Sequence, residues 1–433
     1  MIDRSRQLAF GLVLILALAA QARADAGKTE KPGPLKGQIA VSPQTGMLEG
    51  RSLFIDGHEI AVSQNRFSVK RAGARYDAWL LDKAKRAVTI YQGLTRRDPV
   101  LRVAGNGQAP SMAYQATLHG ILRGDFPFPV ERGRGLNVYL FAEGASSFWQ
   151  AHPLEWGDGQ SAGPRFGRMR VHWSGARAIA GELYAVGEIA EEKRRWVGAW
   201  LAHAPVTLSE GAEVFQEMTM QALPAGHIAG SVSIAGKDVV REIGFDYRLP
   251  GKSNRLALGS CPVLNTYDCR LPDLSSLGGE YCAHIYFQFP VRYQSNGNST
   301  RCAGKLGMTD FSFHVAAEPQ WVGVSRATSM TPKTVLHWKD QGPGVYQVIL
   351  SASYDSKKTG PAIIIYTGQS SVRWPDLSDV GLDFPAGASY GIKVTRYSPC
   401  LSVDELTSAK GWDKSADYEE AEAPPLELNM EKP

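Results

Sequence analysis

The feature of the sequence that most constrains its fold is a short-range alternation of apolar and polar residues. Between Thr334 and Leu350, two such runs, TVLHW and VYQVIL, are separated by a hydrophilic segment that contains Gly and Pro. Successive side chains of a β-strand point to opposite faces of a sheet, so a period of two marks a strand with one buried face. Similar runs recur along the chain, which has 45 glycines and 25 prolines, and few stretches show a helical period. The pattern predicts an all-β protein built of tandem β-sandwich modules.

The last third of the chain gives the sharpest expectation of a core. Large apolar side chains recur there at every second position, and they should share one sandwich interior. They are Leu336, Trp338, Tyr346, Val348, Leu350, Tyr390, Ile392 and Val394. The interleaved residues His337, Gln347 and Lys393 should face outward or lie at the rim.

These residues resemble the fibronectin type III module, which is an immunoglobulin-like sandwich. The matching parts are an early strand tryptophan, a Y-x-V strand and a Pro-x-Gly-x-x-Tyr corner: Trp338, Tyr346 and Val348, and Pro385, Gly387 and Tyr390. The resemblance covers residues 318–401 and implies a spacer or binding module rather than a catalyst. It also implies that the Tyr390 hydroxyl bonds back to the backbone and fixes the corner.

A second resemblance lies in residues 37–103. Phe67-Ser68-Val69 matches an x-F-x-V strand, and the following Tyr76–Leu80 segment has the form Y-D-x-x-L. Together they are similar to the carboxypeptidase regulatory, or transthyretin-like, module, which is usually a noncatalytic accessory. Independently of that resemblance, Phe67 and Val69 should lie on one strand face and Ser68 on the other.

The patterns predict an order of segments along the chain. They are a signal peptide at 1–24, a disordered leader at 25–36, a small β-sandwich at 37–103, a β-sandwich region of one or two domains at 104–257, a cysteine-bearing β module at 258–317, the fibronectin-like sandwich at 318–401, and an acidic, partly disordered tail at 402–433. Within the second sandwich region, Glu188–Arg195 (EIAEEKRR) is expected to form a helical turn or a charged loop.

The N-terminus indicates export. Arg4 and Arg6 precede an apolar run, and Ala22-Arg23-Ala24 has the small-x-small pattern of a cleavage site, so we expect a cut after Ala24. An uncleaved anchor is the alternative, but the run is shorter than the ~20 residues of a spanning helix. The mature chain is therefore expected in the periplasm or outside a bacterial cell, with no transmembrane segment. Cleavage removes three arginines and one aspartate, which lowers the formal charge from +4 to +2. That charge is too small to predict a nucleic-acid partner.

Five cysteines lie in the second half of the chain. Export to an oxidising compartment predicts two disulfides among Cys261, Cys269, Cys282 and Cys302, with all three connectivities open and Cys400 left over. A zinc site that includes His284 is the alternative, but the cysteine spacings lack a short C-x-x-C knuckle.

Motifs of familiar enzymes are missing from the sequence: there is no G-x-S-x-G elbow, H-E-x-x-H motif, phosphate loop or dinucleotide fingerprint. We therefore expect neither cofactor nor metal. The best candidate ligand site is the loop between Gly144 and Gln160, where aromatic rings could cover sugar faces and carboxylates could hold hydroxyls. Its residues are Phe148, Trp149, Glu155, Trp156 and Asp158. The alternative is that the aromatic residues fill one end of a sandwich core.

The sequence predicts a noncatalytic, exported, multi-module β protein that binds a glycan or an envelope protein and acts as a spacer. Two alternatives stay open: a secreted hydrolase of glycans or peptides with a loop-built site in residues 104–257, and an adhesion or assembly subunit that pairs through edge strands. A deep pocket with acids and histidines would favour the enzyme. A shallow aromatic platform would favour glycan binding, and a long uncovered edge strand would favour assembly. The oligomeric state is left open.

Overall fold

Nearly all of the regular structure is β-strand. The computed structural model describes residues 33–40, 51–102, 114–126, 134–142, 145–151, 165–173, 175–191, 195–235, 242–251, 255–288, 296–324, 329–331, 334–339, 342, 344–352, 360–409 and 417–431. The helical segments among them are the short α2 (Val403–Leu406) and the 3-10 turns η1 (Ser275–Leu277) and η2 (Ser378–Val380). The expected signal peptide lies outside the described residues. No described helix combines the length and apolar character needed to cross a bilayer.

The first sandwich contains eight strands around one core. One sheet has the order β4-β5-β1-β8, with β1 (Gly33–Ala40), β4 (Val62–Ser63), β5 (Arg66–Ala72) and β8 (Val100–Arg102). The facing strands are β2 (Arg51–Ile55), β3 (His58–Ile60), β6 (Tyr76–Asp82) and β7 (Ala87–Leu94). Phe67 is buried, Ser68 exposed and Val69 half-buried, as the alternation predicts. Because residues 33–36 begin β1 and pair with β5, the expectation of disorder up to residue 36 is wrong for them.

The middle sandwich is a seven-stranded sheet folded over its own core, in the order β11-β10-β13-β14-β15-β9-β12. Its strands are β9 (Tyr114–Gly124), β10 (Arg134–Ala142), β11 (Ala145–Ala151), β12 (Arg165–Trp173), β13 (Ala178–Glu191), β14 (Arg195–Ser209) and β15 (Glu213–Ala222). The helical turn or charged loop expected over Glu188–Arg195 is wrong for Glu188–Glu191 and for Arg195, because β13 continues to Glu191 and pairs there with Arg195 of β14; residues 192–194 lie outside the described part of the chain. Tyr184 and Val186, which precede this segment in β13, are buried, and the pairing with β14 continues beyond them.

The cysteine-bearing sandwich begins at β16, so the middle region contains one sandwich and part of another. One sheet has the order β19-β16-β22, from β16 (Ala225–Ile234), β19 (Thr266–Pro272) and β22 (Phe313–Val315). It faces β17 (Glu242–Arg248), β18 (Arg255–Pro262), β20 (Glu280–Gln288) and β21 (Asn296–Gly304) across a large core. The predicted boundary at residue 257 falls inside β18. The change from the middle sandwich to the cysteine-bearing sandwich occurs between β15 and β16. It is hard to recognise in the sequence because only Leu223 and Pro224 separate the two strands.

Both expected disulfides are present, and the structure selects one of the three connectivities. Cys261 pairs with Cys269 across the β18–β19 connection, and Cys282 pairs with Cys302 between neighbouring strands β20 and β21. Cys400 is a free thiol and is buried. The bridges hold the two sheets of this sandwich and its central strands together.

The C-terminal sandwich confirms the predicted core. It packs β23 (Gln320–Val322), β25 (Val335–Lys339) and β28 (Ser371–Arg373) on β26 (Val345–Ala352), β27 (Ala362–Thr367) and β29 (Ser389–Ser398). All eight predicted residues lie in one core, each at most 3% exposed. His337 is exposed, and Gln347 and Lys393 are half-buried.

The tyrosine corner implied by the fibronectin resemblance differs here. The Tyr390 hydroxyl is buried but has no hydrogen-bond partner among the residues that the structure describes. Instead, the ring packs against Trp374 and Phe384, with centroids 5.5 and 5.6 Å away. Tyr390 therefore stabilises this corner through aromatic packing rather than through a backbone hydrogen bond.

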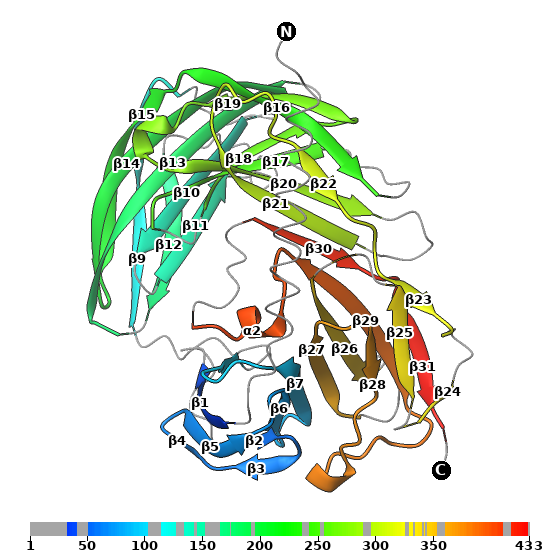
Figure 1. Ribbon diagram of the computed structural model, residues 1–433. Helices are drawn as coiled ribbons and strands as arrows, with labels where there is room; N and C mark the ends of the chain where they lie inside the picture. The colour runs from blue at the N-terminus through cyan, green and yellow to red at the C-terminus, as the bar shows by residue number, and fades with distance from the viewer. Residues whose placement is uncertain are drawn as a thin grey trace.

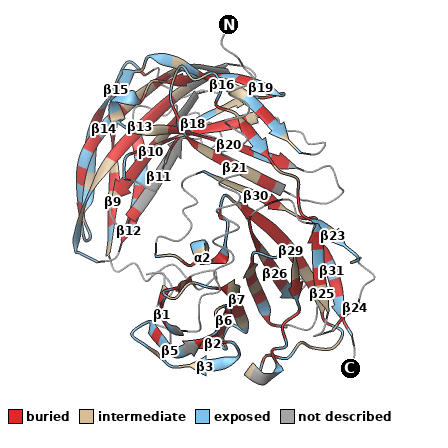
Figure 2. Ribbon diagram, in the orientation of Figure 1, coloured by how far each residue is buried: buried red, intermediate tan, exposed pale blue. Residues whose placement is uncertain are grey.

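A single fourteen-stranded sheet, which we call the long sheet, runs through three of the four sandwiches. The first sandwich joins it where β7 and β27 pair in parallel. In Figure 1, the N-terminal strands in blue accordingly lie beside the C-terminal sandwich, although most of the chain separates them in sequence. Figure 2 shows the alternation of buried and exposed residues along these strands.

The expected disorder of the acidic tail is wrong for residues 417–431. Strand β30 (Tyr418–Glu422) inserts between β21 and β29, and β31 (Leu426–Met430) pairs with β29 and with β24 (Ser329–Met330). The segment LELNM has a period of two, and Leu426, Leu428 and Met430 are buried. The alternation outweighs the acidic composition, which had suggested a solvated tail.

Candidate functional site

One face of the long sheet collects polar and aromatic side chains over β17, β18, β20, β21 and β30, and we call it the outer face. On the opposite face, alternate residues such as Phe245 and Ile285 fill the core of the cysteine-bearing sandwich. Because side chains alternate along a strand, the residues between them point away from that core. They are Asp246, Arg248, Arg255, Ser260, Glu280, His284, Tyr286, Asn298, Thr300, Tyr418 and Glu420.

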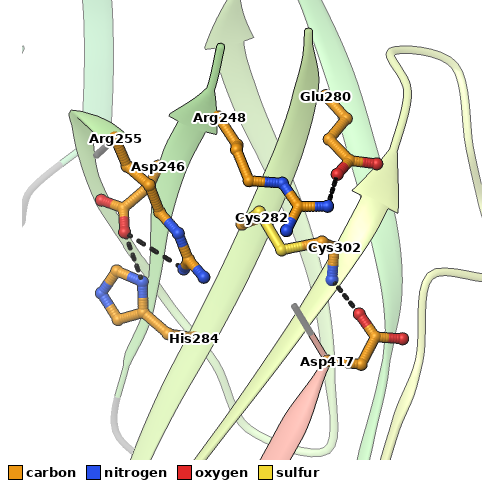
Figure 3. Close-up of a disulfide and its surroundings, with 8 residues drawn as sticks. All are labelled: Asp246, Arg248, Arg255, Glu280, Cys282, His284, Cys302 and Asp417. Atoms are coloured by element: carbon orange, nitrogen blue, oxygen red, sulfur yellow. Dashed lines mark hydrogen bonds and ion pairs between the residues drawn. A yellow bond between two sulfur atoms is a disulfide. The ribbon is translucent and has the colours of Figure 1, made fainter. Parts of the chain in front are cut away.

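Three charged or titratable groups meet at one end of the outer face. His284 Nδ1 lies 3.5 Å from Asp246 Oδ2, and Arg255 Nη1 lies 3.8 Å from the same oxygen (Figure 3). Partial burial lowers the pKa of His284, although Asp246 opposes that shift. Burial likewise raises the pKa of Asp246 against the pull of His284 and Arg255. The imidazole is therefore held largely neutral beside a carboxylate.

The second imidazole nitrogen of His284, Nε2, lies over Gly244 of the neighbouring strand β17. In the strand order, Gly244 of β17 is paired with His284 of β20 on one side and with Ser260 of β18 on the other. A Cβ on Gly244 would come within 2.1 Å of His284 Nε2. Only glycine leaves the space for this arrangement, and Nε2 consequently points along the row toward the neighbouring strand that carries Ser260.

Strand β18 is irregular at this row. Its register with β17 shifts between Gly244 and Asp246, so that Leu258 and Gly259 together oppose one residue, which is a β-bulge. Gly259 has φ +84°, a conformation that glycine adopts without strain. The bulge sets the direction of Ser260 in the next position.

The carboxyl group of Glu188, on β13 of the middle sandwich, lies next to the same bulge. Glu188 Oε2 would lie 3.3 Å from a Cβ on Gly259. Its Oε1 atom is shielded from solvent and has no hydrogen-bond partner among the described residues. Burial raises the pKa of Glu188 to about 8, so the carboxyl is largely protonated at neutral pH. Tyr139 is next to this group, and its hydroxyl makes a hydrogen bond with the backbone of Ala257.

Further along the outer face, an aromatic platform is open to solvent. Tyr286 is 70% exposed, and its ring centroid is 5.6 Å from that of His284 in an edge-on arrangement. Asn298 lies opposite Tyr286 on β21, and its Oδ1 atom is buried without a hydrogen-bond partner in the described part of the chain. Tyr418 of β30 lies next to this pair and makes a hydrogen bond with Thr300.

Tyrosine side chains continue along the outer face from β30 onto β29 and β27, but there they are covered by other side chains. The Tyr397 hydroxyl donates to Gln347 Oε1 at 2.8 Å, and Gln347 Nε2 donates to the Tyr366 hydroxyl at 2.8 Å. Tyr366 stacks on Tyr91, and Val403 and Leu406 of α2 pack against the same cluster. Among the described tyrosines of this face, Tyr286 is exposed and Tyr418 is half-buried, whereas Tyr397 and Tyr91 are buried.

A disulfide supports the middle of the outer face. Arg248 and Glu280 form an ion pair beside Cys282–Cys302, and the Cys302 backbone N–H donates to Asp417 Oδ1 at 2.6 Å (Figure 3). Glu280 and the two sulfurs lie within 4.8 Å of one another. The sulfurs are bonded to each other, however, which removes the thiolates that a metal would need.

The predicted ligand site in the loop between Gly144 and Gln160 is not tested by the structure and stays a prediction. The backbone of Phe148 and Trp149 lies in β11, opposite Tyr139 and Val138, but their side chains are outside what the structure describes, as are Glu155, Trp156 and Asp158 entirely. Sequence analysis missed Tyr286 and Asn298. The alternation in EYCAHIYFQ could have placed His284 and Tyr286 together on one strand face, but it gave no sign that this face stays open.

Two hollows lie elsewhere, and neither contains an acid or a histidine. One of about 640 Å³ is lined by residues of the first sandwich, including the exposed Lys36, Gln38 and Arg66. A second, of about 370 Å³, lies on the middle sandwich near Arg170. Among the described residues, we take the aromatic platform on the open sheet face as the candidate binding site.

Comparison with known proteins does not place the chain in a family. No family model and no curated protein matches it. Among solved structures, it is similar to a leucine-rich repeat protein from Bacteroides thetaiotaomicron, with 13% identity and a TM-score of 0.18, over 47% of this chain and 26% of the other. This chain therefore spans about a quarter of that protein.

Two further similarities involve β-rich proteins. A fimbrial assembly protein from Parabacteroides distasonis matches over 52% of this chain and 95% of its own, with 11% identity and a TM-score of 0.17. The chicken CNTN1 FN1-FN3 domains match over 68% of this chain and 98% of theirs, with 11% identity and a TM-score of 0.17. TM-scores of this size do not establish a shared overall arrangement. The resemblance of residues 37–103 to a carboxypeptidase regulatory module stays a prediction.

Proposed function

We propose that this chain is an exported bacterial protein that binds an extended glycan on the outer face of its long sheet, with the other sandwiches acting as a rigid frame. The observation that carries the proposal is the exposure of Tyr286 amid polar groups. A tyrosine ring 70% exposed on a regular strand contributes little to the core of its own sandwich. An aromatic ring with an apolar face and a polar tip is well suited to a partly wet interface.

The polar groups around Tyr286 favour a sugar over a purely apolar ligand. Asn298 Oδ1 is buried and lacks a donor among the described residues, and such groups are normally hydrogen-bonded in folded proteins. A sugar hydroxyl would supply that donor. Asp246 and Tyr418 lie on the same face and offer further hydrogen-bonding atoms, while the ring of Tyr286 can cover the C–H face of a sugar.

Two features support export. The N-terminal segment has the pattern of a signal peptide, and two disulfides form in the cysteine-bearing sandwich. Disulfides persist in the periplasm and outside the cell but are rare in a reducing cytoplasm. Whether the glycan belongs to the bacterial envelope or to the surroundings is a question for the binding measurement.

The test is titration of the mature chain with defined oligosaccharides from envelope and extracellular polysaccharides, followed by calorimetry. Tyr286→Ala should weaken binding at least about 10-fold, because a buried aromatic anchor is commonly worth 2 kcal/mol or more at an interface. Phe215→Ala is the matched control, since Phe215 is also an exposed aromatic side chain, 56% exposed, but lies on β15 of the middle sandwich. Equal affinities for the wild type and both variants, or no binding to any of the glycans, would reject this function.

A further inference from the structure

Four unusual features meet at the same three residues of β18, Leu258 to Ser260. A bulge interrupts the strand there, and Gly259 adopts a positive φ. The imidazole of His284 lies across Gly244 toward Ser260, with its other nitrogen against Asp246. The carboxyl of Glu188, whose Oε1 has no hydrogen-bond partner among the described residues, reaches Gly259 through Oε2 from a different sandwich. The bulge, Gly259 and Glu188 have no part in the proposed glycan binding at Tyr286, and bulges are enriched beside active sites, where they redirect a side chain.

From this convergence we infer that Ser260, His284 and Asp246 form an acyl-transfer site that hydrolyses carboxylic esters. Asp246 lies against Nδ1 and Ser260 lies on the side of Nε2, which is the order of roles in Ser-His-Asp enzymes. Directly paired residues on neighbouring strands have Cβ atoms about 5 Å apart. Ser260 and Gly244 are such a pair, so the Ser260 Cβ lies about 5 Å from the Cβ position of Gly244, beside which His284 Nε2 lies. Catalytic hydrogen bonds are often long before substrate binds.

The reaction follows from these positions. The Ser260 hydroxyl oxygen attacks the ester carbonyl while His284 Nε2 takes its proton. The bond between the carbonyl carbon and the alcohol oxygen then breaks, His284 returns the proton to the departing alkoxide, and the acyl group stays on Ser260. Water attacks this acyl group with His284 as base, which releases the carboxylic acid and restores the serine hydroxyl. Asp246 orients the imidazole and stabilises its charged form at each step.

Glu188 has a role that suits a protonated carboxyl. A neutral acid with a free oxygen can donate a hydrogen bond to the oxygen that becomes negative when the carbonyl is attacked. An oxyanion with few donors favours esters over amides, because an alcohol leaves more readily than an amine. The substrate class is therefore a carboxylic ester, and the open sheet face suits an ester carried on a larger molecule. This activity does not depend on the identity of the ligand at Tyr286.

The inference reverses the sequence-based expectation that the chain has no catalytic centre. Sequence analysis could not detect it, because Asp246, Ser260 and His284 come from three strands and lie in no recognised motif. The predicted hydrolase site in residues 104–257 includes Asp246 but neither of the other two.

The test uses the mature, disulfide-intact chain with a fluorophosphonate probe, which reacts covalently with activated serines, and with p-nitrophenyl acetate. Peptide mapping should find the probe on Ser260. Ser260→Ala should lose both labelling and hydrolysis, and His284→Gln and Asp246→Asn should lower the rates at least about 100-fold. Ser68→Ala, at an exposed serine on β5, is the matched control and should leave both unchanged.

Glu188 is tested separately as a hydrogen-bond donor. Glu188→Gln keeps an N–H donor and should retain most of the activity, whereas Glu188→Ala should lose about 10-fold or more. Failure of the probe to label Ser260 in the folded wild type would overturn the inference, even if a variant misfolds. Labelling that survives His284→Gln would overturn it as well. Loss of glycan binding with Ser260 still labelled would reject only the binding function, and the converse result would reject only the esterase.

Discussion

Two joins make the long sheet continuous, and they use opposite kinds of side chain. At the first, β7 and β27 pair in parallel, with Ile90 opposite Ile365, both at most 1% exposed. At the second, β30 lies between β21 and β29, where Glu419 pairs with the buried Arg396 and Glu422 pairs with Lys393. One join is an extension of a hydrophobic core, and the other is a strand of acids held by cations.

Because their side chains differ in this way, the two joins should respond differently to solution conditions. Burial of apolar surface is nearly independent of pH. At the second join, burial raises the pKa of Glu419 and of Glu422 despite their cationic partners, so the charged forms are costly there. A carboxyl whose pKa is raised on folding stabilises the fold at low pH and loses that contribution as the pH rises. The β30 join is therefore the one that solution conditions can weaken.

Removal of the tail should have the largest effect on this comparison. A chain that ends at residue 416 lacks β30 and β31 and no longer buries Leu426, Leu428 and Met430, at a cost of about 5 kcal/mol in the C-terminal sandwich. Calorimetry should show its unfolding separate from that of the cysteine-bearing sandwich. A chain that ends at Glu431 is the control and should unfold as the full chain does. If the shorter chain keeps the thermal profile of the full chain, the tail does not hold the join.

The next largest effect is expected at the buried ion pair. Arg396→Ala leaves Glu419 without its cation and should cost about 3–5 kcal/mol in denaturant unfolding. The double variant Arg396→Met with Glu419→Leu should recover most of that loss, because two packed apolar side chains can replace a buried pair. Ile365→Val at the apolar join is the comparison and should cost only about 0.5–1.5 kcal/mol. A loss for Arg396→Ala no greater than that of Ile365→Val would contradict the importance of the charged pair.

A third contact, between the middle sandwich and β18, combines apolar packing with the buried Glu188. Because burial raises the pKa of Glu188 from 4.5 to about 8, its contribution is complete below pH 4.5 and is lost as the pH rises through about 8. Glu188→Gln should therefore raise stability at pH 9 by about 1–3 kcal/mol and leave it nearly unchanged at pH 5. Urea unfolding at the two pH values measures this difference. Parallel pH profiles for the variant and the wild type would show that Glu188 is not the titrating group.

The smallest effect is expected at the tyrosine corner. The Tyr390 hydroxyl makes no hydrogen bond to a described residue, so Tyr390→Phe should change the unfolding free energy by less than about 0.5 kcal/mol. A fibronectin-like backbone bond would instead contribute about 1 kcal/mol. Thermal unfolding of the full chain separates the two cases, and a clear loss of stability would restore the usual corner.

Prediction from the sequence succeeded where the signal was local. The period of two fixed which side chains of β25, β26 and β29 face the core, because a strand has only two faces and one of them must be buried. Export and clustering of cysteines likewise predicted two disulfides, but the choice among three connectivities required the pairing of β20 with β21. The prediction of disorder fails for residues 417–431, because the alternation in LELNM outweighs the acidic composition of the segment.

The all-β class, the inward residues of the C-terminal sandwich and the number of disulfides follow from local sequence, since each depends on neighbouring residues or on the composition of one segment. The pairing of β7 with β27, the insertion of β30 into the long sheet, and the row of Ser260, Gly244 and His284 depend instead on the folded chain as a whole. Strand pairing joins residues far apart in sequence, and its register is set by the packing of whole sheets rather than by any local preference. The candidate site depends on such pairings between distant strands, and for that reason no motif in the sequence indicates it.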